Sequence, residues 1–247
     1  MDFSDNVKGI SSFHHPPKAD RPTEQKVGPT TIPPHKWSAK LSFFRGIVHC
    51  SREEFDEMWD RRPEQTVDPV WGGTISRRQG TFGQEYRFGR QISPNLGPLE
   101  SAPAIVQRCV ETVKNSMADV FEVPDDADFF AHANWYRKES ALGAHQDDET
   151  LHRPGAPIFS FTFFMPGGPG ADYRYFVVSQ NGKAPWGRQW AVPLRHGDAV
   201  VMSGPFQKKH TGVFHRVPAG LKRHEGSRRI NVTVRVKLAP KESTESV

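Results

Sequence analysis

A histidine and an aspartate stand two residues apart in the segment NWYRKESALGAHQDDE, residues 134–149. On a β-strand, side chains two positions apart point to the same side, so His145 and Asp147 can bind one metal ion. A second histidine from a distant strand would complete a two-histidine, one-carboxylate face with open coordination positions. Such a face is typical of iron(II) sites that also bind a co-substrate and oxygen. The alternative is that these are polar residues of a loop, because His-x-Asp arises readily by chance in a chain with 11 histidines.

The second histidine must come from further along the chain, where several histidines are available. His196 begins a His-Gly-Asp turn and is expected to face solvent, and His224 lies in a basic loop. His215 lies within GVFHRVP, a predicted strand, and His210 stands just before that strand. His215 is therefore the favoured ligand, and His210 remains the alternative.

The segment RINVTVR, residues 229–235, alternates strictly between polar and apolar residues. Its polar side chains, Arg229, Asn231, Thr233 and Arg235, share one face of the predicted strand. If that face is buried, both arginines need anionic partners, because an unpaired buried charge is costly. Arginine binds carboxylates through two parallel hydrogen bonds, so the pattern fits a metal-bound dicarboxylate such as 2-oxoglutarate. The alternative is an edge strand with its polar face in water.

The elements that must position these residues follow from hydrophobic patterning. Ser51 and Glu54 form a capping-box pattern that begins a helix, and Pro63 ends it. An apolar stripe predicts a second helix over 102–118. After residue 127, short β-rich segments separated by Gly, Pro and Asp dominate, at 127–137, 157–165, 172–179, 188–194, 198–203, 212–217 and 228–237. The chain is therefore expected to be mainly β with flanking helices, in an antiparallel sandwich or barrel.

Composition bounds the class of protein. With 36% hydrophobic and 25% charged residues, the chain can form a packed globular core. Residues 1–35 and 239–247 lack periodicity and are predicted to be disordered tails around a single domain, 36–238. Cys50 and Cys109 stand among apolar residues, which predicts buried thiols in a reducing compartment. No apolar run approaches the roughly 18 residues of a membrane helix, and no secretory signal or membrane association is expected. The net charge of +5 and pI near 9.3 permit an acidic partner without requiring one.

In combination, these motifs resemble the AlkB-like iron(II)/2-oxoglutarate dioxygenases, which oxidatively demethylate nucleic-acid bases. The resemblance covers about residues 68–237, roughly two thirds of the chain. The motifs that carry it are Asn134-x-Tyr136, His145-x-Asp147, PIFS at 157–160, HGD at 196–198 and RINVTVR at 229–235. VWG at 70–72 and RQ at 78–79 are similar to the double-stranded-DNA repair members of the family.

The resemblance implies a double-stranded β-helix (jelly-roll) core over 127–238, with helical support and a nucleotide-recognition lid over 36–126. It implies that iron is held by His145, Asp147 and His215. The distal carboxylate of 2-oxoglutarate would be bound by Arg229, helped by Tyr136 and Asn231, with Asn134 and Arg235 against its metal-proximal end. The implied reaction consumes oxygen and 2-oxoglutarate, hydroxylates the methyl group of a 1-methyladenine- or 3-methylcytosine-type base and releases formaldehyde.

A base inside a duplex must be flipped out to reach the iron. The resemblance implies that Phe88 stacks on the flipped base, Tyr86 lines its pocket and Glu149 contacts a cationic methylated base. Trp71 matches an aromatic finger that enters the base stack. Each of these residues has a plainer interpretation, as a core aromatic or a solvated acid.

Candidate phosphate contacts are Arg77, Arg78, Lys208 and Lys209, although charged pairs are usually solvated surface. The expected partners are alkylated DNA, with RNA open, and molecular oxygen. A monomer is expected inside the cell, in the nucleus or the cytoplasm, with the nucleus favoured by the substrate. Two other classes stay open: an iron/2-oxoglutarate oxygenase acting on a small molecule or protein, and a non-catalytic β-sandwich binding module.

Overall fold

The computed structural model describes residues 41–65, 75–88, 91–147, 155–170, 172–180, 188–207 and 212–237. The tails predicted to be disordered, 1–35 and 239–247, lie outside the described residues. Among the helices of the described ranges, none is long and apolar enough to cross a membrane.

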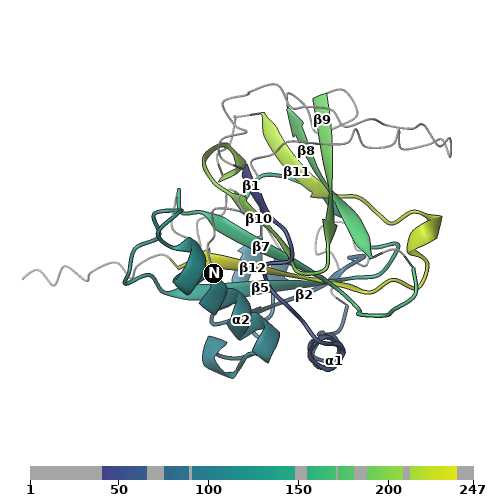
Figure 1. Ribbon diagram of the computed structural model, residues 1–247, viewed down its shortest axis with the longest axis horizontal. Coiled ribbons are helices and arrows are strands. Elements are labelled where there is room, and N and C mark those ends of the chain that lie inside the picture. Colours follow the sequence, from purple (N-terminus) through teal and green to yellow (C-terminus); the bar gives the residue numbers. More distant parts are fainter. Residues whose placement is uncertain are drawn as a thin grey trace, which may run out of the picture.

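Two facing antiparallel sheets form the core of the described residues (Figure 1). The six-stranded sheet runs in the order β1 (Leu41–Phe44), β10 (Asp198–Met202), β7 (Ile158–Phe164), β12 (Arg229–Val236), β5 (Phe129–Tyr136) and β2 (Arg78–Phe82). The four-stranded sheet runs in the order β6 (Leu142–His145), β11 (Val213–Val217), β8 (Tyr173–Gln180) and β9 (Arg188–Arg195). A separate hairpin joins β3 (Tyr86–Phe88) to β4 (Gln91–Ser93). The predicted mainly-β, jelly-roll class is confirmed.

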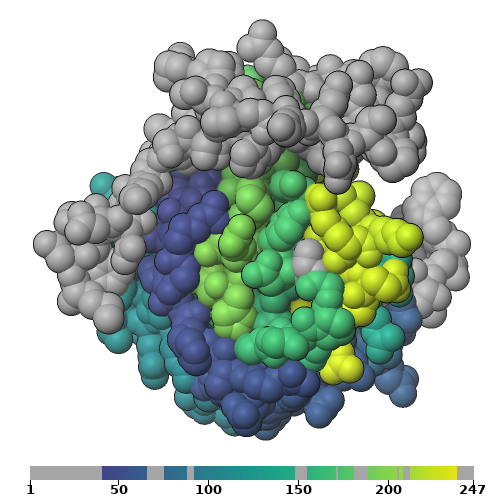
Figure 2. All heavy atoms as spheres, turned by 45° about the vertical axis from the view of Figure 1, so that its right-hand side comes forward, coloured from purple at the N-terminus to yellow at the C-terminus, as the bar shows by residue number. Residues whose placement is uncertain are grey.

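The first strand and the C-terminal half share one sheet although they are far apart in the chain. Leu41 pairs with Met202 and Phe44 pairs with Ala199, so β1 closes the edge beside β10. Figure 2 shows the same arrangement from outside, with the purple N-terminal segment lying alongside the green strands. Because this pairing joins segments about 150 residues apart, local sequence patterns do not predict it.

The predicted strands after residue 127 are all present, within one or two residues of their expected ends. Five observed strands were not predicted: β1, β2, β3, β4 and β6. They are short, and β2 (RQGTF) and β6 (LGAH) each contain a glycine, which weakens a strand pattern.

Both predicted helices are confirmed. Helix α1 (Arg52–Asp60) begins with the expected capping box: the Glu54 amide donates to Ser51 Oγ at 3.2 Å, and the Ser51 amide donates to Glu54 Oε2 at 2.8 Å. Helix α2 (Ala104–Thr112) continues into a wider helical turn over Val113–Met117. Both helices cover one face of the six-stranded sheet, and the four-stranded sheet faces the other (Figure 1).

Two apolar clusters result from this layering. The larger lies between the helices and the sheet and includes Phe55, Val106, Phe161 and Val232. The smaller lies between the two sheets and includes Phe176, Trp190 and Val200. Cys50 and Cys109 are buried free thiols, as predicted.

Strand β12 decides how the space between the sheets is used. Because β12 has β5 on one side and β7 on the other, the edge-strand alternative for RINVTVR is wrong. The four apolar side chains of β12 join the helix-side cluster, and Arg229, Asn231, Thr233 and Arg235 are buried on the opposite face. A row of polar groups therefore lines the interior between the two sheets.

Candidate active site

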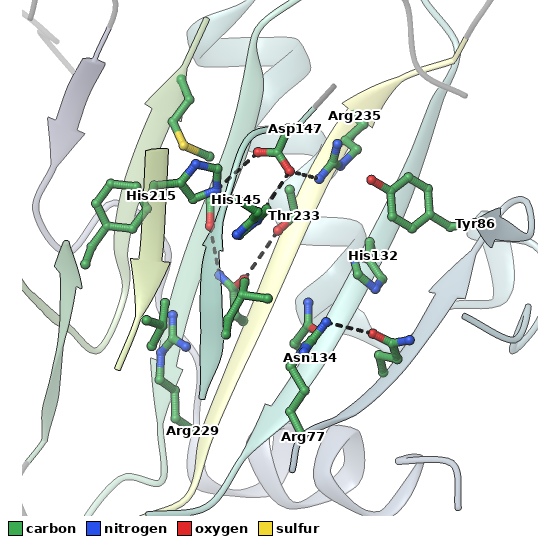
Figure 3. Close-up of a pocket in the computed structure, with 17 residues that line it drawn as sticks. Arg77, Tyr86, His132, Asn134, His145, Asp147, His215, Arg229, Thr233 and Arg235 are labelled. Carbon is green, nitrogen blue, oxygen red and sulfur yellow. Dashed lines mark hydrogen bonds and ion pairs between the residues drawn. The ribbon is translucent and has the colours of Figure 1, made fainter. Parts of the chain in front are cut away.

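Three potential metal ligands meet between the sheets (Figure 3). His145 ends β6 and Asp147 lies just after it, while His215 comes from β11. His145 and His215 are directly opposite each other in the β6–β11 ladder, and their ring centroids are 4.1 Å apart. The ligand atoms of the three residues all lie within 4.8 Å of one another. His215, the favoured histidine, is therefore at the site, and His210 lies outside the described residues.

Burial prepares both imidazoles to bind a cation, and a hydrogen bond also orients His145. His145 Nδ1 is 2.8 Å from the carbonyl oxygen of Gly143, which orients Nε2 toward Asp147. Burial lowers the pKa of His145, despite the opposing effect of Asp147. Burial also lowers the pKa of His215 to about 3, and the neighbouring His145 adds to this shift. Both rings are therefore neutral near pH 7, with a nitrogen lone pair available to a metal.

The carboxylate of Asp147 stays ionised although it is buried. Burial by itself raises its pKa, but Arg235, followed by the two histidines, offsets this effect and holds the pKa below its usual value. Arg235 Nη2 donates to Asp147 Oδ1 at 2.8 Å. His215 Nε2 is 3.3 Å from Asp147 Oδ2. Two neutral imidazoles and one carboxylate form a donor set that fits iron(II).

At the other end of β12, Arg229 is buried without a carboxylate partner among the described residues. Its Nη2 donates to Thr162 Oγ1 at 3.0 Å, and its guanidinium lies 4.7 Å from the Tyr136 ring centroid. Its Nε and Nη1 atoms have no hydrogen-bond partner within the described part of the chain. A buried cation with free donors is costly unless an anion binds it. The pocket is thus suited to a dicarboxylate that reaches from the metal ligands to Arg229, which fits 2-oxoglutarate.

The two predicted amides, Asn134 and Asn231, line the pocket, whereas Tyr136 is buried outside this lining with its ring against the Arg229 guanidinium. Asn231 Nδ2 donates to Ser160 Oγ at 2.9 Å and to the carbonyl oxygen of Phe161 at 2.6 Å. Asn134 Oδ1 accepts a hydrogen bond from Arg77 Nε at 2.9 Å. These contacts fix both amides on the sheet. Their roles in binding 2-oxoglutarate stay predictions.

Side chains from both sheets and from the β3–β4 hairpin line one continuous pocket (Figure 3). Its lining residues are Arg77, Gln79, Tyr86, His132, Asn134, Leu142, His145, Asp147, Ser160, Phe176, Met202, His215, Val217, Arg229, Asn231, Thr233 and Arg235. Four apolar side chains, Leu142, Phe176, Met202 and Val217, lie among guanidinium, amide, imidazole and hydroxyl groups in this lining. Such a pocket can exclude water and still hold a charged ligand.

The predicted substrate residues are placed differently from one another. Arg77 points into the pocket, and its Nη2 donates to Gln79 Oε1 at 3.1 Å. Arg78, next in the strand, points away and donates to the Pro63 carbonyl oxygen at 3.2 Å. Tyr86 is buried in the pocket wall, with the Arg235 guanidinium 5.0 Å from its ring centroid. The assignment of Arg77 and Arg78 as phosphate contacts stays a prediction.

Several predicted residues cannot be placed. Phe88 belongs to β3, but its side chain is not described. The others that lie outside the described residues are Trp71, Glu149, Lys208 and Lys209.

Of the two histidines set aside as ligands, His196 differs from its expectation, and His224 lies in a basic turn as expected. His196 does not simply face solvent: its Nδ1 is 2.7 Å from the Phe164 carbonyl oxygen, and the ring contacts Phe163. His224 is buried, and its Nδ1 accepts from the Leu221 amide at 2.8 Å. Both histidines stabilise turns and take no part in the metal centre.

Sequence reasoning missed two buried polar residues that shape the site. His132 lines the pocket two residues before Asn134, and the alternation of FFAHANWY was a usable signal for it. Arg174 donates to the carbonyl oxygens of Ser140 at 2.7 Å and Pro218 at 3.0 Å, which ties together the loops after β5 and β11. Burial lowers the pKa of Arg174 to about 10. No local pattern marks Arg174, because both loops are distant from it in sequence.

This chain is similar in sequence to a family of oxygenases and to one human protein. A model of the 2OG-Fe(II) oxygenase superfamily matches residues 57–235. The DNA oxidative demethylase ALKBH2 of Homo sapiens is 27% identical over 171 residues, which cover 68% of this chain and 59% of that protein. The match thus spans less than two thirds of ALKBH2.

Two solved structures are similar in outline. One is HygX from Streptomyces hygroscopicus with nickel, 2-oxoglutarate and hygromycin B bound, at 14% identity and a TM-score of 0.47. The other is a 2OG-Fe(II) oxygenase family oxidoreductase from Burkholderia pseudomallei, at 15% identity and a TM-score of 0.42. Each comparison covers 81% of this chain and 84% of the other.

Proposed function

Because this chain belongs to the 2OG-Fe(II) oxygenase superfamily, we propose that it demethylates N-alkylated bases in DNA, as the name of its human relative ALKBH2 describes. One observation supports this proposal above the others. The iron ligands and the anion-binding Arg229 share a single pocket with Arg77 and Tyr86. Arg77 is a candidate phosphate contact, and the resemblance implies that Tyr86 lines the pocket of the flipped base.

The chain's own residues would hold both cofactors. His145, Asp147 and His215 would bind iron(II), and Arg229 would bind the distal carboxylate of 2-oxoglutarate beside Thr162. When bound, iron(II) and 2-oxoglutarate use oxygen to hydroxylate a carbon–hydrogen bond, with succinate and CO2 as the co-products. Arg235 would keep the ligand carboxylate of Asp147 ionised and oriented.

The reaction on the base balances simply. One oxygen atom enters the N-methyl group, and the resulting cationic N-hydroxymethyl base loses its hydroxyl proton and formaldehyde, which leaves the neutral, unmethylated base. The protein's part is to hold the methyl group at the metal and to exclude water from the pocket. An aromatic stack returns about 1–3 kcal/mol of the cost of flipping a base. Tyr86 and Phe88 belong to strand β3 of the hairpin, and Phe88 is the residue predicted to stack on the base.

We further propose that Glu149 and Trp71 contact the methylated base and the base stack, in keeping with the resemblance. Acting on DNA, the protein would work as a monomer in the nucleus. Demethylation of RNA is the related activity that the same pocket chemistry permits.

The deciding experiment incubates the full chain with iron(II), 2-oxoglutarate and oxygen, with oligonucleotides that contain 1-methyladenine or 3-methylcytosine. Succinate and formaldehyde are expected in amounts equal to the restored base, by mass spectrometry. Unmethylated oligonucleotides and the Asp147→Ala variant are the controls. Turnover of 2-oxoglutarate that ignores methylated oligonucleotides of both kinds would instead favour an oxygenase of small molecules or proteins.

A further inference from the structure

A row of side-chain contacts connects the β3–β4 hairpin to the metal ligands, and Figure 3 shows its members Tyr86, His132, Arg235 and Asp147. Ser93 Oγ on β4 is 3.1 Å from His132 Nε2, and the His132 and Tyr86 ring centroids are 4.9 Å apart. Beyond Tyr86 lies the Arg235 guanidinium, which binds Asp147 at 2.8 Å. All five residues are buried.

His132 holds both strands of the hairpin at one position. Tyr86 on β3 and Ser93 on β4 are directly opposite each other in the hairpin ladder, and one imidazole contacts both. Each of these strands has only three residues. An isolated two-stranded hairpin is marginally stable in water, so this one depends on contacts with the rest of the protein.

His132 itself is fixed by the six-stranded sheet. On β5 it is paired with Thr233 on one side and with Thr81 on the other, so its ring points into the interior between the sheets. Burial lowers its pKa strongly, and the nearby cations Arg235 and Arg77 lower it further. The ring is therefore neutral, and its nitrogen can accept the hydroxyl hydrogen of Ser93.

We propose that His132 is a positioning residue that docks the β3–β4 hairpin on the pocket and, through Tyr86 and Arg235, couples the order of the hairpin to the Asp147 ligand. Metal binding holds the Asp147 carboxylate and, with it, the Arg235–Tyr86 contact in one arrangement. A docked hairpin in turn favours the arrangement that binds metal, because coupling between two sites is reciprocal. This coupling does not depend on which substrate the enzyme uses.

Amide hydrogen exchange of residues 86–93 tests the proposal on the full chain, with and without nickel(II) plus 2-oxoglutarate. Nickel(II) stands in for iron(II), so that no turnover occurs. In the wild-type protein, nickel(II) and 2-oxoglutarate are expected to slow exchange in the hairpin. Ser93→Ala is expected to speed hairpin exchange about fivefold, as the loss of one hydrogen bond implies, and to reduce the slowing that nickel(II) brings.

Ser101→Ala is the matched control, because the Ser101 hydroxyl donates within its own turn, to the Pro98 carbonyl oxygen at 3.2 Å. It should leave hairpin exchange as in the wild type. His132→Asn, which can restore a hydrogen bond to Ser93, should exchange more slowly than His132→Leu.

Unchanged hairpin exchange in Ser93→Ala would overturn the docking role. Faster exchange with full metal-induced slowing would overturn the coupling. Because no nucleic acid is present, neither result bears on the proposed demethylase activity, which the oligonucleotide assay tests separately.

Discussion

Replacing Arg229 with methionine should weaken 2-oxoglutarate binding and yet stabilise the protein without 2-oxoglutarate. Arg229 is 2% exposed, and its Nε and Nη1 have no hydrogen-bond partner among the described residues. Without its anion, the guanidinium is a buried charge whose desolvation costs several kcal/mol. Among the described residues, the hydrogen bond to Thr162 and the contact with the Tyr136 ring offset part of that cost.

The magnitudes follow from these contacts. The Thr162 hydrogen bond and the Tyr136 contact contribute about 1–2 kcal/mol each, which is less than the desolvation of the charge. Arg229→Met is therefore expected to raise the free energy of unfolding by about 1–2 kcal/mol. Removing one partner of a buried charge pair costs about 2–5 kcal/mol, so the dissociation constant for 2-oxoglutarate should rise on the order of thirtyfold to several thousandfold.

Urea unfolding of the protein without 2-oxoglutarate measures the first quantity, and an anaerobic titration of the iron(II) protein with 2-oxoglutarate measures the second. Arg174→Met is the matched control. Arg174 is equally buried but donates to the carbonyl oxygens of Ser140, Pro218 and Arg137. That variant should lose about 2–4 kcal/mol of unfolding free energy, because three acceptors are left without their donor. If Arg229→Met destabilises the protein as much as Arg174→Met, the reasoning that Arg229 is an uncompensated buried charge is wrong. If the variant binds 2-oxoglutarate normally, Arg229 does not bind this anion.

The remaining predictions concern titration, reactivity and helix capping. Burial lowers the pKa of His215 from 6.5 to about 3. Between pH 6.5 and pH 3 the unfolded chain therefore binds more protons than the folded protein. The metal-free protein should thus lose stability as the pH falls through this range. His215→Gln should flatten that slope in urea unfolding by up to about 1.4 kcal/mol per pH unit; an unchanged slope would contradict the burial effect. Burial raises the pKa of Cys50 to about 12, and it also holds the pKa of Cys109 well above the usual range of a thiol. Iodoacetamide at about pH 8 should therefore label both thiols only after unfolding. Rapid labelling of the folded protein would show that they are accessible. Ser51→Ala should lower the free energy of unfolding by about 0.5–2 kcal/mol, because the cap of helix α1 is lost. The KM for 2-oxoglutarate should stay the same. A changed KM would mean that this end of the helix influences the pocket.

Much of the fold follows from sequence because its signals are local. The cap of α1 depends on residues three positions apart, and the polar face of β12 depends on strict alternation within a single strand. The pair His145 and Asp147 was visible because the two residues are close in the chain. Each of these signals comes from residues only a few positions away from the feature that they predict, and tertiary packing did not override these local preferences.

Only the tertiary structure decided which distant groups meet. It made β12 a central strand by placing β5 and β7 beside it, and it put His215 opposite His145. It gave Arg235 the Asp147 carboxylate as a partner and left two donors of Arg229 without a partner among the described residues. It also brought His132 beneath a hairpin some forty residues earlier in the chain. The physical reason is that pairing and register between remote strands are set by burial summed over the whole core, and no short segment of sequence contains that sum.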